Sequence, residues 1–284
     1  MMTNLILFRY VTFIFLILNV VSVHGYYVID PTGGYDRRFD GIGGLSGGGA
    51  TSRFLPDYIE PSRSQILKVE IGGGGQSTQG TEHSHMYNET DENYERGYEW
   101  WLMQEAKKHN PNIQLYGLAW SFPNWVAHGR EALVNKTVPY IVNWLLGAKR
   151  LYDLNIDYVG IWNEHTPPEG HYIITLRRQI LAAGLETKII AADAVHGWDI
   201  CEYVANDTDL AEAVYAFGGH YVHSLSAPIC SSLNKPIFAS EDFSNVRGIV
   251  FSVQNFRNTE VLTLKMVNRD GNRIKRKGHL TFSA

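Results

Sequence analysis

The chain has 284 residues, of which 44% are hydrophobic and 19% are charged, and its formal net charge is −4. These values describe one globular domain with a full core, about the size of a single α/β barrel. Residues 245–284 carry eight Lys or Arg and two acids, so the rest of the chain is acidic. An acidic body argues against nucleic acid as a partner.

The first 25 residues differ from the rest of the chain. Arg9 precedes fourteen uncharged residues, and small residues follow near Gly25. This pattern is typical of a cleaved secretory signal. A membrane anchor is the alternative, although a span needs about 20 apolar residues. We therefore expect a signal peptide at 1–25, a barrel domain at 26–244 and a basic tail of unknown structure at 245–284.

Entry into the secretory pathway makes two features of the sequence informative, the glycosylation motifs and the cysteines. Asn88, Asn135 and Asn206 each begin an Asn-X-Ser/Thr motif, so we expect glycosylation at all three. Cys201 and Cys230 are the two cysteines of the chain. An oxidising compartment permits one disulfide between them, and two buried thiols are the alternative.

Strand-like and helix-like segments alternate along the body of the chain. This alternation is typical of a parallel sheet with crossover helices. The predicted strands are 39–47, 68–74, 113–120, 157–164, 188–194, 213–221 and 236–242. The predicted helices are 95–110, 138–155 and 171–184, and Gly184 stands where the last one would end. The fold class is therefore α/β, with seven strands of a TIM-type barrel.

Two glutamates stand at the ends of predicted strands. Glu164 follows Trp162 and Asn163 after the fourth strand, and Glu241 ends the seventh. Sugar hydrolysis needs one carboxylic acid to protonate the leaving oxygen and a second carboxylate on the other side of the bond. A barrel delivers such groups from the C-terminal ends of its strands. The two residues are our candidate catalytic pair.

The sequence offers no convincing cofactor or metal motif. The glycine-rich segment at 41–50 lacks a glycine at the sixth position, where Ser46 stands, so it fails the dinucleotide fingerprint. Glycines at strand ends more simply let the backbone pass close to a bound substrate. Glu82, His83 and His85 have a spacing that suits chelation, but a loop at the barrel rim is the simpler interpretation. We therefore predict no cofactor and no metal.

Several motifs together resemble the galactocerebrosidase (galactosylceramidase) family. The resemblance extends from Tyr27 to Ser244. It rests on these stretches: FDGIGGLSGGGATSR, SRSQIL, KVEIGGGGQSTQGTEHSHM, ENYERGYEWWLMQEAKKHNPNI, GLAWSFPNW, GAKRLYDLNIDYVGIWNE, KIIAADA and SEDFS.

The resemblance implies a retaining glycosidase on a (β/α)8 barrel followed by β-rich domains. It assigns the acid/base role to Glu164 and the nucleophile role to Glu241. It also implies that Thr78, Trp120 and Asn163 contact the galactose, with Asn163 bonding its 2-hydroxyl group. A galactolipid substrate, a saposin-type lipid-presenting activator, membrane contact through substrate presentation alone and a lysosomal or secreted location follow from the same resemblance.

The chain departs from the family pattern at two places. Between Gly49 and Lys68 the family has a full helix, whereas here one βα unit is cut short. After Ser244 we find no match, so we expect an incomplete barrel without an eighth strand. Pro236–Ser240 would then be an open sheet edge. The alternating segment Thr259–Val267 is the one candidate for covering that edge.

Two functions therefore compete. The first is a retaining β-galactosidase that hydrolyses galactosylceramide and related galactolipids. The second is a catalytically inactive, secreted galactolipid-binding remnant that keeps the residues of the site but not their geometry.

Overall fold

A computed structural model describes residues 39–46, 65–75, 80–128, 131–132, 134–165, 170–195, 197–221, 228–241 and 252–257. All of them belong to one compact unit, which includes Asp36–Val261. The predicted signal peptide, the candidate strand Thr259–Val267 and the shortened connection between the first two strands lie outside the described residues.

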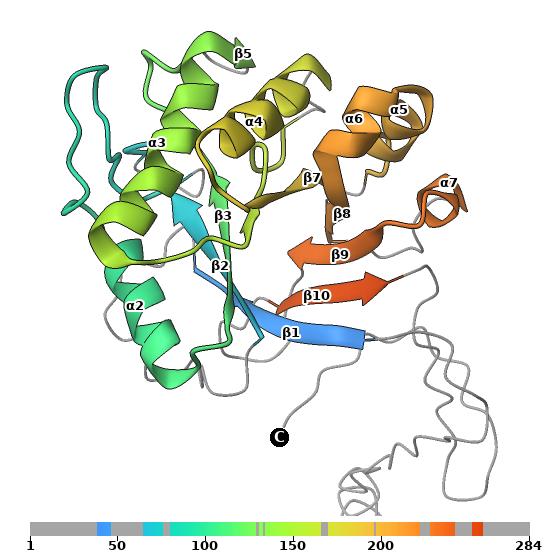
Figure 1. Cartoon of the computed structure of the whole chain (residues 1–284), viewed down its shortest axis with the longest axis horizontal. Coiled ribbons are helices and arrows are strands. Elements are labelled where there is room, and N and C mark those ends of the chain that lie inside the picture. The colour runs from blue at the N-terminus through green and yellow to red at the C-terminus, as the bar shows by residue number, and fades with distance from the viewer. Residues whose placement is uncertain are drawn as a thin grey trace, which may run out of the picture. The chain divides into compact units, whose positions relative to one another are not determined.

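The described strands form a closed barrel, and seven of them run parallel as predicted (Figure 1). Around the barrel each parallel strand pairs with its neighbour in chain order. The seven strands are β1 (Phe39–Leu45), β2 (Ile66–Ile71), β3 (Gln114–Ala119), β6 (Tyr158–Val159), β7 (Lys188–Val195), β8 (Val214–His220) and β9 (Pro236–Glu241). The pattern of short apolar segments therefore located every parallel strand.

The seven predicted parallel strands are confirmed, and an antiparallel strand takes the place of the missing eighth parallel one. Strand β10 (Ser252–Arg257) lies between β9 and β1 and is antiparallel to both. Pro236–Ser240 is thus paired rather than an open edge. The orientation has a simple cause, since ten residues separate β9 from β10. A parallel return needs a crossover of a dozen residues or more, whereas a short loop suffices for an antiparallel pair.

Helices lie on the outside of the strands (Figure 1). The three predicted helices are confirmed. Gly184 adopts a φ of +72° just after α4, and its backbone N–H donates to Leu181 O at 3.0 Å, as a helix-ending glycine does. The helices and the small hairpin strands are α2 (Glu99–His109), α3 (Val134–Tyr152), α4 (Gly170–Ala182), α5 (Ile200–Asn206), α6 (Thr208–Ala213), α7 (Pro228–Ser232), β4 (Ala127–His128) and β5 (Glu131–Ala132).

Two apolar layers follow from the alternation of side chains along the strands. All six residues of β2 are buried, as expected for a parallel strand covered on both faces. Leu67, Val69 and Ile71 join the large cluster that includes the helix side chains. Ile66 instead joins a smaller cluster of residues drawn mainly from the strands. Lys68 shares the face of Ile66, so a charged side chain enters the barrel interior.

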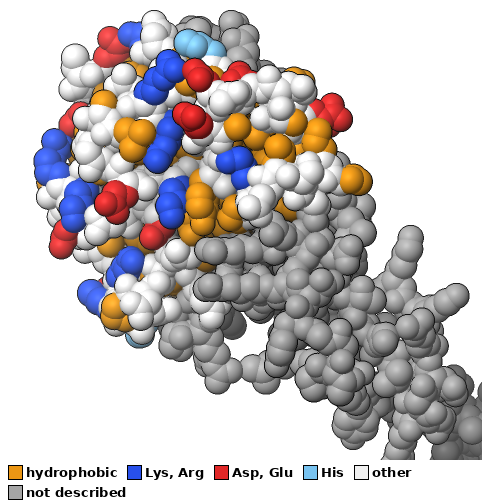
Figure 2. All heavy atoms as spheres, turned by 45° about the vertical axis from the view of Figure 1, so that its right-hand side comes forward, with side chains coloured by type: hydrophobic (Ala, Val, Ile, Leu, Met, Phe, Trp, Pro, Cys, Tyr) orange, Lys and Arg blue, Asp and Glu red, His pale blue; other side chains and the backbone are white. Residues whose placement is uncertain are grey.

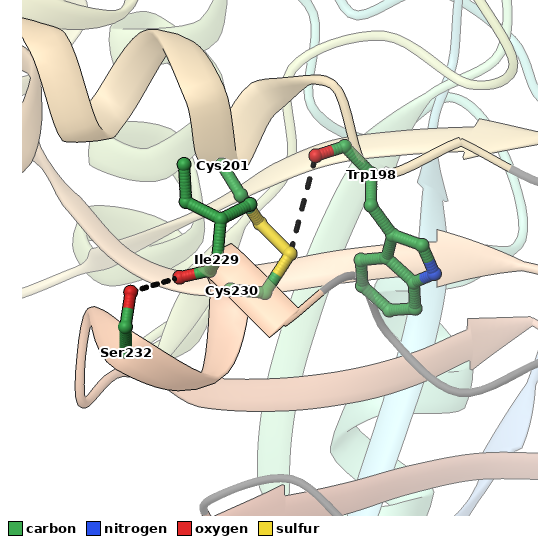
Figure 3. The surroundings of a disulfide bond; sticks show 5 residues. All are labelled: Trp198, Cys201, Ile229, Cys230 and Ser232. Carbon is green, nitrogen blue, oxygen red and sulfur yellow. Dashed lines mark hydrogen bonds between the residues drawn. A yellow bond between two sulfur atoms is a disulfide. The ribbon is translucent and has the colours of Figure 1, made fainter.

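A disulfide joins two helices beside the barrel. Cys201 of α5 and Cys230 of α7 are bonded, with their Cα atoms 5.1 Å apart (Figure 3). The question that the sequence left open is therefore answered in favour of the bridge. By the loop-entropy relation, closing 29 residues stabilises the fold by about 3–4 kcal/mol. The bridge also agrees with passage through an oxidising compartment.

The three predicted glycosylation sites lie on the surface. The side chains of Asn88, Asn135 and Asn206 are all exposed. On the face shown in Figure 2, cationic and anionic side chains are interspersed, with apolar side chains between them. Among the described residues, no helix combines the length and the apolar character that a bilayer crossing needs.

Candidate active site

The two candidate glutamates meet at one end of the barrel. Glu241 is the last residue of β9, and Glu164 follows β6 by five residues. In a parallel barrel the C-terminal strand ends form a common rim, where enzymes place their catalytic groups. One oxygen of Glu164, one oxygen of Glu241 and a ring nitrogen of His220 all lie within 4.8 Å of one another. The structure therefore brings the predicted pair together.

His220 lies between the glutamates and was not singled out in the sequence. It ends β8 and is fully buried. Its Nδ1 atom is 3.2 Å from Glu164 Oε1 and 3.7 Å from Glu241 Oε2. The signal was present, because a histidine at the end of a predicted strand shares the rim with the glutamates.

Tyr221 holds the nucleophile candidate. Its hydroxyl donates a hydrogen bond of 2.6 Å to Glu241 Oε1. Burial, followed by the nearby Glu241 carboxylate, raises the pKa of Tyr221, so the hydroxyl stays a donor. The other oxygen, Glu241 Oε2, is buried and has no hydrogen-bond partner. One oxygen is thus fixed while the other remains available for a reaction.

A buried ion pair lies behind His220. Lys68 Nζ is 3.1 Å from Asp193 Oδ1, and both side chains are inaccessible to solvent. Tyr116 donates to Asp193 Oδ2 at 2.5 Å, and His220 Nε2 lies 3.2 Å from Asp193 Oδ1. Burial alone would raise the pKa of Asp193, but the nearby charge of Lys68, with smaller effects from its other neighbours, holds it well below its ordinary value. Asp193 is therefore an anion at the base of the site.

The backbone around the site adopts sparsely populated conformations. Glu164, Asp193 and Tyr221 have φ angles of 54°, 56° and 50°. The pairing of β7 with β8 shifts register around Asp193, and that of β8 with β9 shifts just before His220. Such bulges turn a side chain toward a new direction and gather at active sites. They bring successive strands' polar side chains into one cluster.

Glu164 does not have the raised pKa that a resting general acid requires. Its hydrogen bond with His220 lowers the pKa, and the opposing effect of burial is smaller. About a third of the side chain is exposed. In the free site Glu164 is therefore the carboxylate that His220 stabilises.

Two of the three predicted sugar-contact residues border the same rim. Trp120 follows β3 and is 6% exposed, with Lys68 Nζ 5.4 Å from its ring centre. The backbone N–H of Asn163 bonds Ala119 O, and its buried Oδ1 atom accepts no hydrogen bond. That oxygen is free to accept one from a ligand hydroxyl. Thr78 lies outside the described residues.

The glycine-rich segment after β2 serves the fold of the rim. A Cβ atom on Gly72 would lie 2.2 Å from His83 O, and one on Gly73 would lie 2.1 Å from Ser121 O. Glycine is therefore required because neighbouring loop backbones approach closely. For this pair the close packing of the loops is enough to require glycine, whether or not a substrate also approaches.

The candidate chelating loop is also structural. Glu82 Oε1 accepts the backbone N–H groups of Tyr98 and Glu99, at the start of α2. His85 is buried against the ring of Tyr140, with centroids 4.3 Å apart. A different set, Glu164 with His220 and Glu241, has donor atoms close enough together for a cation. In that set Tyr221 donates to Glu241 Oε1, His220 Nδ1 lies against Glu164 Oε1, and Lys68 Nζ lies against His220 Nε2.

A pocket of about 330 Å³ lies at the opposite end of the barrel. It is bordered by the first residues of β7, β8 and β9, including Lys188, and by Arg177 and Lys235. Lys235 Nζ donates to Ala211 O and Val214 O at 2.7 Å each. Arg177 likewise donates to a backbone carbonyl. Arg177 and Lys235 therefore bond carbonyl groups near the ends of helices and strands, away from the catalytic rim.

The sequence matches the profile of glycosyl hydrolase family 59 over residues 39–270. The chain belongs to glycosyl hydrolase family 59. The match continues past Ser244, so the prediction that the resemblance ends there is wrong.

Galactocerebrosidases of several animals are similar to this family 59 chain. The galactocerebrosidase of Salmo salar is 50% identical over 238 residues, covering 77% of this chain and 35% of its own length. That of Homo sapiens is 47% identical over 251 residues, covering 81% of this chain and 36% of its own length. A putative galactocerebrosidase of Caenorhabditis elegans is 33% identical over 223 residues, covering 73% and 34%. The chain thus spans about a third of the length of these relatives.

Solved structures with low sequence identity share the barrel fold of this family 59 chain. SrfJ from Salmonella typhimurium matches with a TM-score of 0.58 and 16% identity, covering 75% of this chain and 60% of its own. An endo-β1,6-glucanase matches with a TM-score of 0.52 and 17% identity, covering 68% and 53%. These matches concern the fold alone.

Proposed function

We propose that this chain is a retaining β-galactosidase that hydrolyses the galactosyl bond of galactosylceramide and related galactolipids. The observation that carries the proposal is the close approach of Glu164 and Glu241, with oxygens within 4.8 Å. Retaining glycosidases hold their carboxyl groups about 5–5.5 Å apart, whereas inverting enzymes need about 6.5–9.5 Å to admit a water molecule. Membership of family 59 and similarity to galactocerebrosidases support the choice of substrate.

In the first step Glu241 is the nucleophile. Its free oxygen, Oε2, attacks the anomeric carbon while the bond from that carbon to the lipid oxygen breaks. Glu164 gives its proton to the departing oxygen. Tyr221 holds the other Glu241 oxygen in place, which favours attack from one defined direction. The result is a galactosyl ester of Glu241 and a free lipid alcohol.

In the second step Glu164 acts as a base. It takes a proton from a water molecule, whose oxygen attacks the anomeric carbon as the ester bond to Glu241 breaks. Galactose leaves with its original β configuration. In this proposal the Asn163 Oδ1 atom, which has no other hydrogen-bond partner, accepts a hydrogen bond from the sugar 2-hydroxyl group, and the Trp120 ring offers an apolar face to the C–H side of the sugar.

The setting of the reaction is part of the proposal. A galactolipid must leave its membrane to reach a barrel rim, so we include a saposin-type lipid-presenting activator as a partner. The Cys201–Cys230 bridge and the exposed Asn-X-Ser/Thr motifs favour the secretory pathway, with the lysosome or the exterior as destination.

The test compares two isosteric variants of the full chain, produced by secretion. Glu241→Gln should abolish turnover of every β-galactoside, because nothing replaces the nucleophile. Glu164→Gln should lower the turnover of an alkyl galactoside by about 10²- to 10⁴-fold. With a dinitrophenyl galactoside it should still release dinitrophenol in a burst, because that leaving group needs no proton.

Equal losses of both variants on the activated substrate would contradict the assigned roles. The competing function, a galactolipid-binding remnant, predicts a different outcome. The folded wild-type chain would then bind galactosylceramide in vesicles but turn over neither substrate.

A further inference from the structure

The hydrogen-bond partners of Lys68 fix where the proton of His220 lies. An ammonium group has three N–H donors and no acceptor. Lys68 Nζ has three acceptor candidates in reach: Asp193 Oδ1 at 3.1 Å, His220 Nε2 at 3.1 Å and Ser240 O at 3.2 Å. All three donors are satisfied if Nε2 accepts. A hydrogen on Nε2 could bond Asp193 Oδ1, 3.2 Å away, but it would oppose a hydrogen of Lys68 at 3.1 Å and leave one Lys68 donor without an acceptor.

If Nε2 accepts, a neutral His220 carries its proton on Nδ1. Nδ1 faces Glu164 Oε1 at 3.2 Å and Glu241 Oε2 at 3.7 Å. One N–H group therefore lies within reach of two carboxylates. The carboxylate that accepts its hydrogen bond has its negative charge stabilised. Among the described residues, the charged or titratable groups around the ring that take part in this arrangement are Lys68, Tyr116, Glu164, Asp193, Tyr221 and Glu241.

We propose that Lys68 holds His220 as an Nδ1–H donor, and that this donor alternates between Glu164 and Glu241 as the reaction proceeds. Lys68 and His220 are thus positioning residues. The inference rests on the proposed function, because it assigns the proton traffic of that same site.

The alternation follows the charges of the two steps. Before the first step Glu241 must be ionised and Glu164 protonated, so Nδ1–H bonds Glu241. In the galactosyl-enzyme Glu241 is an ester without charge, while Glu164 is ionised, so Nδ1–H bonds Glu164. When the ester breaks and Glu164 has taken a proton from water, the donor returns to Glu241. No proton leaves His220, and each step remains balanced.

The free site shows one of these two positions. The shorter contact is with Glu164, which is the carboxylate that His220 stabilises without substrate. The contact with Glu241 is 0.5 Å longer and leaves Oε2 without a hydrogen bond. A bound substrate would place its leaving oxygen against Glu164. Once Glu164 is protonated, the Nδ1–H group of His220 would bond Glu241 instead.

The tautomer can be read without any turnover. Histidine labelled with ¹⁵N distinguishes a protonated ring nitrogen from an unprotonated one, and substitution of His220 identifies its signals. We expect Nδ1 protonated and Nε2 unprotonated in the wild-type chain. Lys68→Met should move the proton to Nε2, which can then donate to Asp193. A protonated Nε2 in the wild type would overturn the proposal, even if Lys68→Met fails to fold.

A matched pair of variants tests the role of the donor in catalysis. The amide of His220→Asn can place an N–H close to the position of Nδ1, whereas His220→Gln reaches Lys68 but offers no donor to the glutamates. His109→Gln, on the exposed end of α2, is the control. The measurement is the pH profile of kcat/KM with an alkyl β-galactoside.

We expect His220→Gln to lower kcat/KM by about 10- to 150-fold. It should also move the alkaline limb of the profile to higher pH, because Glu164 loses the donor that stabilises its ionised form. His220→Asn should keep the limb near its wild-type position. Loss of activity in both variants with an unmoved limb would show a structural role and overturn the alternation. A wild-type chain that turns over no galactoside would overturn the proposed function and the alternation together, while the tautomer is decided separately.

Discussion

At the scale of single residues, the site depends on which group holds each proton. Glu164 receives a hydrogen bond from His220, and Glu241 receives one from Tyr221. Both donors favour the ionised form of the carboxyl groups. Two glutamates at the ends of predicted strands predict two carboxylates. They do not predict the two donors, which lie at the end of β8 and directly after it.

The lowered pKa of Glu164 predicts an acidic pH optimum. The general acid must be protonated in the free enzyme for kcat/KM toward an alkyl galactoside. Because His220 holds the pKa of Glu164 below the ordinary glutamate value, kcat/KM should fall as the pH rises through that lowered value. A dinitrophenyl galactoside needs no acid and should lack this limb. Kinetics with both substrates over the acidic range check the prediction.

A limb for the alkyl substrate at or above the ordinary glutamate pKa would contradict this account of the free site. So would an identical limb for both substrates, since the limb would then report a group other than the acid.

At the scale of elements, the loop before α2 contains a buried cluster of carboxyl groups. Glu82 bonds two backbone N–H groups at the start of α2, and Glu70 bonds those of Thr81 and Glu82. Burial raises the pKa of Glu82 to about 7, with smaller effects from its neighbours. Burial and the nearby acids also raise the pKa of Glu99 well above its ordinary value.

The raised pKa of Glu82 predicts that this group stabilises the fold in acid. Through Glu82 the folded chain holds a proton that the unfolded chain loses between about pH 4.5 and about pH 7, so its contribution falls as the pH rises through this range. The contribution amounts to about 3 kcal/mol at most. The buried His85, whose pKa is lowered to about 3, acts in the opposite direction. The measurement is therefore a comparison with Glu82→Gln, which keeps the acceptor oxygen: the thermal midpoint of the wild type, relative to that of the variant, should fall as the pH rises through this range.

Glu105→Gln is the control, because Glu105 forms a surface pair with the exposed Lys108 and should leave the dependence unchanged. A wild-type midpoint that rises toward neutral pH relative to that of Glu82→Gln would contradict the role given to Glu82.

At the scale of the whole molecule, much of the barrel could be predicted from the sequence. Most of the parallel strands are buried on both faces and therefore appear as short apolar runs, such as residues 188–194, between helical stretches. Glu164 and Glu241 could be paired because both end such runs. The helix ending at Gly184 was predicted from the conformational freedom of that glycine.

Other features depend on contacts that the local sequence does not encode. Strand β10 contains no distinctive pattern, and its position is set by the gap between β9 and β1. Asp193 and His220 face one another because of irregular pairing between neighbouring strands. The ammonium group of Lys68 is stable inside the barrel because Asp193, far away in the sequence, compensates its charge.

The central claim is that this family 59 chain forms a galactosyl ester on Glu241. The direct measurement is incubation of the full chain with a 2-deoxy-2-fluoro-galactosyl fluoride, followed by mass spectrometry of its peptides. The fluorine slows both steps, while the good leaving group lets the first proceed, so the ester accumulates. We predict one fluorogalactosyl group on Glu241, with loss of turnover in proportion to labelling. Turnover of a galactoside without any covalent adduct, or an adduct on another residue, would contradict the claim.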